Sequence, residues 1–212
     1  MRYTVTTIPN GKWKQNCYAV SADATRAALL IDPGSDAPLI EHVLAKHGLM
    51  PVAIVNTHAH YDHVGAVDRL MSKYKIPFYL HCADQKLLKQ ANLYKLLFDS
   101  RDSIVIPQPT HELTTLEPRI QLSEFEVNIL FTPGHTQGSC CLLIDGDLFS
   151  GDTLLSNGQG RTDLPGGNKT SMLNSVELLR ELPPTTTVWP GHGRSFALGS
   201  VWEKLDSTGA TI

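Results

Sequence analysis

Short apolar runs alternate with amphipathic segments along the first half of the chain, and turn residues separate them. Period-two and fully apolar runs predict strands at Tyr3 to Ile8, Cys17 to Ser21, Ala27 to Ile31, Val52 to Asn56 and Ile76 to Leu80. Helical spacing predicts one helix capped by Ser35 or Asp36 and stopped at Gly48. Two more helices are predicted from an N-cap at Asp62 to about 74, and over 83–98 with Leu96 and Leu97 among its apolar positions.

The second half of the chain is predicted to form mainly strands. They are predicted at about 111–116, 119–122, 125–131, 139–144, 147–150 and 185–189, with helices at 169–182 and 197–206. Asp145-Gly146 is typical of the turn of a tight hairpin. Strands and helices are interspersed throughout, without a linker. We therefore expect one α/β domain over 1–212, with two sheets packed face to face and helices outside.

Composition and charge exclude several classes of protein. The chain has 212 residues and a net charge of −3 without a basic run, which argues against a nucleic-acid partner. Its apolar runs are far shorter than the roughly 18 residues of a membrane span, and Met1 to Asn10 does not resemble a signal peptide. The 4 cysteines form no spaced framework, so we expect free thiols and a cytoplasmic location.

One short run concentrates side chains that bind metals. His58, His60, Asp62 and His63 follow directly on the apolar run 52–55, so they occupy the loop at the end of a buried strand. Imidazole nitrogens and carboxylate oxygens are the ligands that zinc and similar divalent ions take. A solvated histidine cluster is the alternative, and this run favours a metal site.

Three later segments repeat one design, in which a strand leads into a glycine-containing loop with a further ligand. These ligands are His135, Asp152 and His192. Any one of them alone indicates only a turn. Together with the first run they make seven potential ligands, more than a closed four-coordinate site needs. With one carboxylate bridging, seven ligands suit two ions with room for water, which indicates catalysis.

The order His-x-His-x-Asp-His, His, Asp, His resembles the metallo-β-lactamase fold superfamily over essentially the whole chain. The resemblance implies an αββα sandwich of two mixed sheets flanked by helices. It places His58, His60 and His135 on one ion, Asp62, His63 and His192 on the other, and Asp152 between them. It implies two divalent ions, with Zn²⁺ expected and Fe or Mn also suited to these ligands.

The sequence around the ligands narrows this resemblance. Thr132 to Thr136, Ser150 to Leu154 and Pro190 to Gly193 resemble glyoxalase II, the hydroxyacylglutathione hydrolases, and Gly160 to Gly167 resembles their short bacterial branch. Dizinc β-lactamases have Cys at the position of Asp152, which argues against antibiotic hydrolysis. Only 193–212 follow the last ligand, so we expect no C-terminal helical domain for glutathione.

The resemblance implies a metal-dependent hydrolase that cleaves a thioester such as S-lactoylglutathione, as in methylglyoxal detoxification. Two cations lower the pKa of a bridging water from about 15.7 towards 7. The resulting hydroxide attacks the thioester carbonyl, with Asp62 and Asp152 as the catalytic carboxylates. A mononuclear iron persulfide dioxygenase, which Gly160 to Asp163 also resembles, and a non-enzymatic metal-binding module remain as alternatives.

Three residues are candidates for contacting a small-molecule thioester. Arg161 is expected to bind a substrate carboxylate and Asp163 to orient a histidine ligand, unless the two form only a surface ion pair. Asn16 is expected to line the mouth of the site. The remaining histidines are treated as structural or solvated; they are His42, His47, His81 and His111. The sequence leaves open whether the protein is a monomer or a small homo-oligomer.

Overall fold

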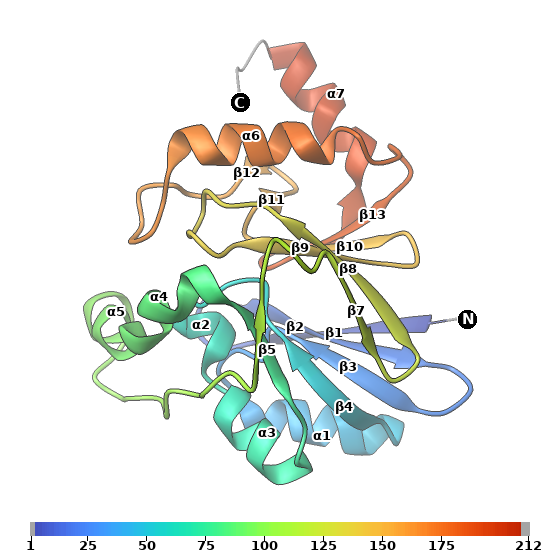
Figure 1. Cartoon of the computed structure of the whole chain (residues 1–212), viewed down its shortest axis with the longest axis vertical. Coiled ribbons are helices and arrows are strands. Elements are labelled where there is room, and N and C mark those ends of the chain that lie inside the picture. Colours follow the sequence, from blue (N-terminus) through green and yellow to red (C-terminus); the bar gives the residue numbers. More distant parts are fainter. Residues whose placement is uncertain (1–2, 209–212) are drawn as a thin grey trace.

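Two six-stranded sheets lie face to face between two layers of helices in the computed structural model, which describes residues 3–208 and the side chains of 3–203 (Figure 1). The first sheet has the order β1-β2-β3-β4-β5-β6, with bounds Tyr3–Asn10, Gln15–Ala22, Ala27–Ile31, Met50–Val55, Phe78–His81 and His111–Leu113. The strands β1 to β3 pair antiparallel and β3 to β6 pair parallel, so the sheet is mixed.

The second sheet is also mixed. Its order is β14-β13-β10-β9-β8-β7, with bounds Phe196–Ala197, Thr187–Pro190, Asp147–Gly151, Cys140–Ile144, Phe125–Phe131 and Arg119–Leu122. Only β10 and β13 pair in parallel. The expected turn at Asp145-Gly146 joins β9 to β10, and both residues have positive φ, as this tight hairpin turn requires.

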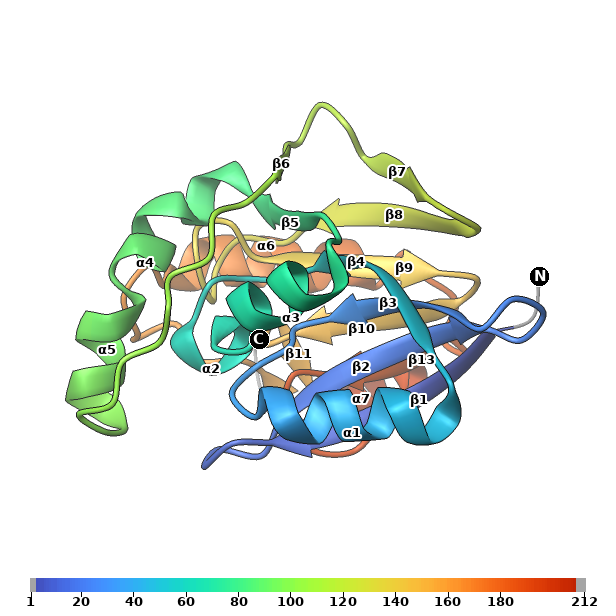
Figure 2. The ribbon, with the colours of Figure 1, turned by 90° about the horizontal axis from the view of Figure 1, so that it is seen from below.

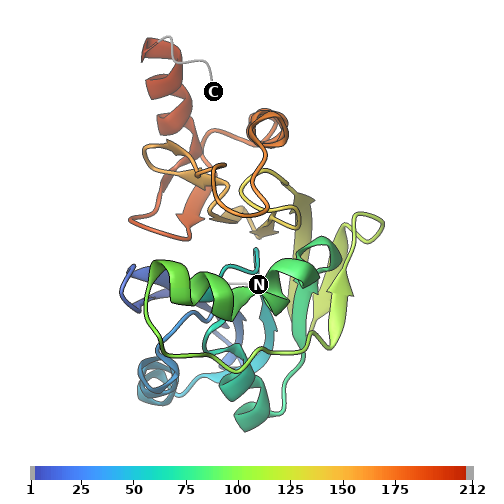
Figure 3. The same cartoon turned by 90° about the vertical axis from the view of Figure 1, so that its left-hand side faces the viewer.

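The helices are α1 (Ala37–His47), α2 (Tyr61–Val64), α3 (Val67–Tyr74), the 3₁₀ turn η1 (Cys82–Asp84), α4 (Gln85–Lys89), α5 (Ala91–Phe98), α6 (Lys169–Leu179) and α7 (Leu198–Thr208). Figure 2 shows α1 and α3 lying across the outer face of the first sheet. Figure 3 shows α6 and α7, in orange and red, on the opposite side of the molecule from α1, in blue.

Buried apolar residues form three layers that match this arrangement. One cluster, with Ile40 and Leu70, lies between the first sheet and its helices. A second, with Phe125 and Phe149, fills the space between the two sheets, and a third, with Val176, lies under α6 and α7. Because each face of each sheet is covered, the expected αββα sandwich is confirmed.

Two segments that were predicted as single helices are each divided in the structure. The helix expected after Asp62 is two helices, because Gly65 and Ala66 pack against the Pro33–Gly34 turn, where a Cβ on Gly65 would lie 2.5 Å from the Gly34 carbonyl oxygen. Its first segment begins after His60, so Asp62 lies within the first turn and is not the N-cap. The helix expected over 83–98 divides at Gln90, and it leaves Leu96 and Leu97 exposed on α5.

Three strands of two residues each were not predicted, because a run of two residues is too short to show a hydrophobic period. They are β11 (Leu154–Leu155), β12 (Gly158–Gln159) and β14. The expectation of free cysteines is confirmed for all 4, and the neighbours Cys140 and Cys141 belong to different buried clusters on opposite faces of β9. Within the described part of the chain, no helix has the length and apolarity needed to cross a bilayer.

Candidate metal centre

Four loops that leave strand ends meet at one edge of the two sheets. They follow β4, β8, β10 and β13, and they carry the seven side chains that the sequence singled out. One backbone hydrogen bond crosses between the sheets, from Cys140 N–H at the start of β9 to Thr57 O in the loop after β4 (2.9 Å), and a second joins the ends of β13 and β10 within the second sheet, from Gly191 N–H to Gly151 O (2.7 Å). The strand ends hold the loops rigidly, which is the setting that a metal site needs.

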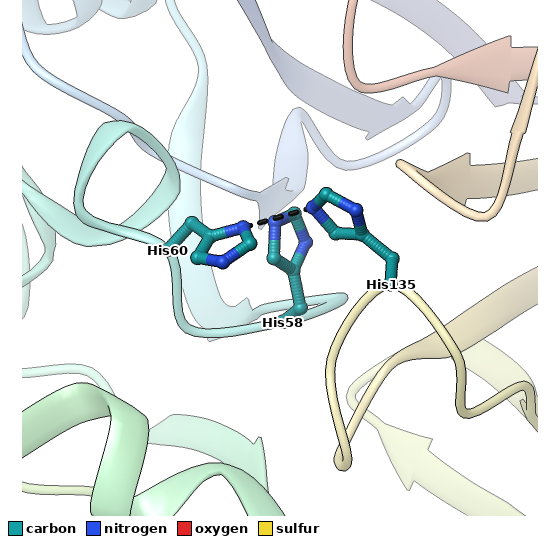
Figure 4. A group of neighbouring side chains, drawn as sticks. All are labelled: His58, His60 and His135. Atoms are coloured by element: carbon teal, nitrogen blue, oxygen red, sulfur yellow. Dashed lines mark hydrogen bonds between the residues drawn. The ribbon is translucent and has the colours of Figure 1, made fainter. Parts of the chain in front are cut away.

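Three imidazoles form one group. Potential ligand atoms of His58, His60 and His135 all lie within 4.8 Å of one another, and the three side chains are buried. His60 Nδ1 and His135 Nε2 are 2.8 Å apart. Figure 4 shows the two rings from the loop after β4 turned towards the ring from the loop after β8. Three imidazoles with converging nitrogens match the donor set of a divalent transition-metal ion.

A second group lies beside the first and is more polar. Ligand atoms of Asp62, His63 and His192 lie within 4.8 Å of one another, and His192 Nε2 is 3.4 Å from Asp62 Oδ2. Asp152 stands between the two groups. Its Oδ2 lies 3.5 Å from His135 Nε2 in the first group and 3.6 Å from His192 Nε2 in the second.

The outward nitrogens of several rings are held by partners that the sequence analysis missed. His63 Nδ1 lies 3.0 Å from Asp32 Oδ2, His135 Nδ1 lies 2.8 Å from the carbonyl oxygen of Arg161, and His192 Nδ1 lies 3.1 Å from that of Trp13. Such contacts orient imidazole rings so that the other nitrogen faces the metal. Asp32 follows β3 directly, and the position after a strand is the one signal that could have identified it.

The donor atoms that face the interior fit a cation. His58 Nε2, His63 Nε2 and Asp152 Oδ1 are buried without a hydrogen-bond partner. An unsatisfied buried polar atom costs about 1–3 kcal/mol, so three at one place indicate a bound ion. Asp32, His58 and His63 also lie close enough to hold an ion. However, the carboxylate of Asp32 already accepts the N–H and O–H of Thr57 (2.7 and 2.6 Å), so it acts as a support.

The electrostatics of the cluster favour neutral rings in the first group. Burial, followed by the neighbouring imidazoles, lowers the pKa of His58 well below its usual value, and the same causes lower the pKa of His60 to about 3. Neutral imidazole is the form that binds metals.

The second group carries charge. Burial opposes ionisation of Asp62 and Asp152, but the imidazoles around them, His63 foremost, outweigh it and lower both pKa values. Burial likewise lowers the pKa of His63, but Asp62 and Asp152 outweigh it and raise that pKa to about 9. A metal ion bound to these nitrogens would take the place of the protons that they hold.

Glycines let the ligand loops approach one another. Gly151 has a φ of +49°, and a Cβ there would lie 2.3 Å from Thr57 Oγ1. A Cβ on Gly191 would lie 2.1 Å from Asp152 Oδ1. The Gly-Asp and Gly-His pairs therefore mark places where one ligand loop contacts another, as well as turns.

The three candidate substrate residues lie in two different settings, and Arg161 and Asp163 form the surface ion pair that was the alternative expectation. Arg161 and Asp163 form an exposed bidentate ion pair, with side chains 67% and 69% exposed. The carbonyl group of Arg161 orients His135, and the carboxylate of Asp163 is engaged with the guanidinium instead. Asn16 is 3% exposed and donates to the carbonyl oxygens of Pro190 (3.0 Å) and Gly193 (2.8 Å), so its amide nitrogen holds the His192 loop.

The four remaining histidines lie outside both groups. His42, His47 and His111 are exposed, whereas His81 is buried and stacks on Phe131 with ring centroids 4.5 Å apart. Their settings agree with a structural or solvated role.

Fold and site together define a class of metal-dependent hydrolases, in which an αββα sandwich carries histidine and aspartate clusters at one edge. The chain belongs to the metallo-beta-lactamase superfamily, whose family model matches residues 10–192. Membership supports a hydrolase with a divalent metal site.

Similar proteins cover nearly the whole chain. The probable metallo-hydrolase YqgX of Bacillus subtilis is 39% identical over 189 residues, which are 88% of this chain and 88% of that protein. A hydroxyacylglutathione hydrolase of Xanthomonas axonopodis is 32% identical and covers 91% of this chain, with 66% of its own length matched.

Solved structures agree in fold. The crystal structure of BLEG-1 B3 metallo-beta-lactamase has a TM-score of 0.87 and 34% identity, covering 96% of this chain and 97% of its own. The crystal structure of TTHA1623 in a di-iron-bound form has a TM-score of 0.83 and 35% identity, covering 92% of this chain and 96% of its own.

Proposed function

We propose that the protein is a two-metal hydrolase that cleaves a thioester such as S-lactoylglutathione. His58, His60 and His135 would hold one ion, Asp62, His63 and His192 the other, and Asp152 both. The position of Asp152 carries this proposal, because its Oδ2 lies within 3.6 Å of an imidazole nitrogen from each group. The di-iron form of TTHA1623 supports two ions on this fold. Zn²⁺ suits these donors, as do iron and manganese.

Two divalent ions would supply a hydroxide nucleophile near neutral pH and stabilise the oxyanion. The exposure of the ligand side chains indicates the side from which a substrate would approach. The first group is buried, whereas Asp62, Asp152 and His192 have side chains 16%, 14% and 27% exposed. A substrate would therefore approach over these three residues. A thiolate leaving group has a pKa near 8.5, so it departs with little help from a general acid.

Two observations support an acyl-thioester as the substrate. The segments around His135, Asp152 and His192 resemble hydroxyacylglutathione hydrolases, and a protein of that name is 32% identical to this chain. The similarity to BLEG-1 B3 metallo-beta-lactamase favours β-lactam hydrolysis as a second candidate.

One set of measurements separates the candidates. Metal content per chain is determined first, and the same preparation is assayed for loss of S-lactoylglutathione absorbance, hydrolysis of a chromogenic cephalosporin and oxygen uptake on glutathione persulfide. We expect two ions and thioester cleavage that a chelator abolishes. Faster cephalosporin hydrolysis would favour the β-lactamase candidate. One iron with oxygen uptake and no thioester cleavage would identify a dioxygenase instead.

Replacing Arg161 by alanine tests whether its side chain contacts the substrate. The exposed ion pair with Asp163 contributes little to stability because solvent screens it, and the backbone carbonyl that orients His135 remains. We expect unchanged metal content and melting temperature. A role in binding a substrate carboxylate predicts a KM increase of about 10- to 100-fold with kcat retained, since a hydrogen bond to a charged group contributes about 1.5–3 kcal/mol. An unchanged KM would restrict Arg161 to its backbone role.

A further inference from the structure

Asp84 stands at the N-cap of α4, yet its side chain does not cap that helix. The side chains of Asp36 on α1 and Asn168 on α6 do cap their helices. Each accepts a hydrogen bond from the backbone N–H three residues later. Capping is the usual reason for an aspartate at this position. The carboxylate of Asp84 therefore serves other groups, and it is 1% exposed.

The carboxylate joins the two loops that carry the three-imidazole group. Asp84 Oδ2 accepts the N–H of Ala59 (2.9 Å), which lies between His58 and His60. The same oxygen accepts the O–H of Thr136 (2.8 Å), the residue after His135, and Oδ1 accepts the N–H of Gly138 (2.7 Å).

The fit around this carboxylate is close. A Cβ on Gly138 would lie 2.7 Å from Asp84 Cγ, so the loop reaches the carboxylate only because residue 138 is glycine. Ser139 Oγ accepts the N–H of Thr136 (3.0 Å), which fixes the same turn from its other side. The loop after β8 thus folds around Asp84.

We propose that Asp84 is a positioning residue that fixes the His58–His60 loop against the His135 loop and so sets the geometry of the three-imidazole group. This inference rests on the proposed metal centre. The two loops leave strands of different sheets, β4 and β8, and the buried carboxylate bonds to both at once. All three of its partners are donors. An aspartate suits them, whereas an asparagine would turn its NH₂ group towards at least one donor.

Loss of the Asp84 contacts should affect the three-imidazole group alone. In the second group, His63 is supported by Asp32 and His192 by the carbonyl oxygen of Trp13. Weakening the Asp84 contacts should therefore loosen the first ion and leave the second. A general loss of stability would weaken both ions together.

The test is a metal titration of Asp84→Asn against the wild-type protein, with Co²⁺ as a spectroscopic probe and a competing chelator. We expect the affinity for one ion to fall about 10- to 100-fold, as for other partners of metal ligands, and that for the second ion to stay within twofold. The absorption bands of the weakened ion should change. Asp36→Ala is the matched control, because it removes a hydrogen-bonding aspartate at an exposed N-cap whose bond goes to Leu39 within α1, and it should leave both affinities unchanged.

Thr136→Val is the second variant, and it decides the question if Asp84→Asn does not fold. It removes one of the three donors while both backbone contacts remain, so we expect a smaller loss at the same ion. Wild-type affinities in these variants, or equal weakening of both ions, would overturn the inference. If the wild-type protein binds one ion only, the proposed two-metal function is wrong. The inference about Asp84 is then tested on that single ion, and it is also wrong if the variants bind this ion with wild-type affinity.

Discussion

Replacing Asp152 by alanine is expected to weaken the binding of both metal ions by at least about 100-fold and to reduce hydrolysis at least as much. A partner of a metal ligand typically accounts for 10- to 100-fold in affinity, and a carboxylate placed between both groups should exceed that. The variant would leave His135 and His192 without the carboxylate 3.5 and 3.6 Å from their Nε2 atoms. The loss should therefore include both ions.

Metal analysis after dialysis, together with the thioester assay, measures this effect. Asp147→Ala is the matched control, because it alters an aspartate at the opposite end of β10 and should retain both ions and full activity. Two ions retained at full activity in Asp152→Ala would falsify the ligand assignment. Loss of one ion alone would limit Asp152 to a single group.

Replacing Asp32 by asparagine is expected to weaken the ion held by His63 about 10- to 100-fold and to lower stability by about 1–3 kcal/mol. The carboxylate is 2% exposed and accepts from Thr57 N, Thr57 Oγ1 and His63 Nδ1. An amide has one acceptor oxygen, so a buried donor loses its partner. A neutral amide also holds the ring of His63 less firmly than a carboxylate does, which weakens the contact that directs its Nε2 towards Asp62 and Asp152.

Zinc competition titration and chemical denaturation of the metal-free protein separate the two effects. Asp145→Asn is a close control. Asp32 and Asp145 both have a φ of 48°, which asparagine tolerates, but Asp145 is exposed in a hairpin turn. Wild-type metal affinity in Asp32→Asn, with stability lowered, would show that Asp32 supports the fold without tuning the site.

The sequence was most informative where a pattern and a position coincided. His58 and His60 follow an apolar strand, and the structure brings them within 4.8 Å of His135, which is more than seventy positions away. The strands β3, β7 and β8 have the predicted bounds, because apolar periodicity and turn residues define them together. Asp145-Gly146 forms its turn for the same local reason.

Prediction failed where contacts between distant segments override local pattern. Asp62 is a residue type typical of an N-cap, but it lies in the first turn of α2, and the packing of Gly65 and Ala66 against the Pro33–Gly34 turn ends that helix. The side chain of Asn16 holds the His192 loop, a contact that the local pattern does not indicate. Leu96 and Leu97 continue a helical apolar pattern, yet α5 leaves them exposed.

The sequence by itself determined the α/β class, the donor types and the order of the potential ligands, because these depend on local periodicity and residue chemistry. Only the tertiary structure decided which donors share a group, and that Asp152 lies between His135 and His192. It also showed which groups Asp32 and Asp84 bond to, since these partners lie 25 to 54 positions away. Strand ends from two sheets meet at one edge, and that meeting places the seven side chains around a common centre.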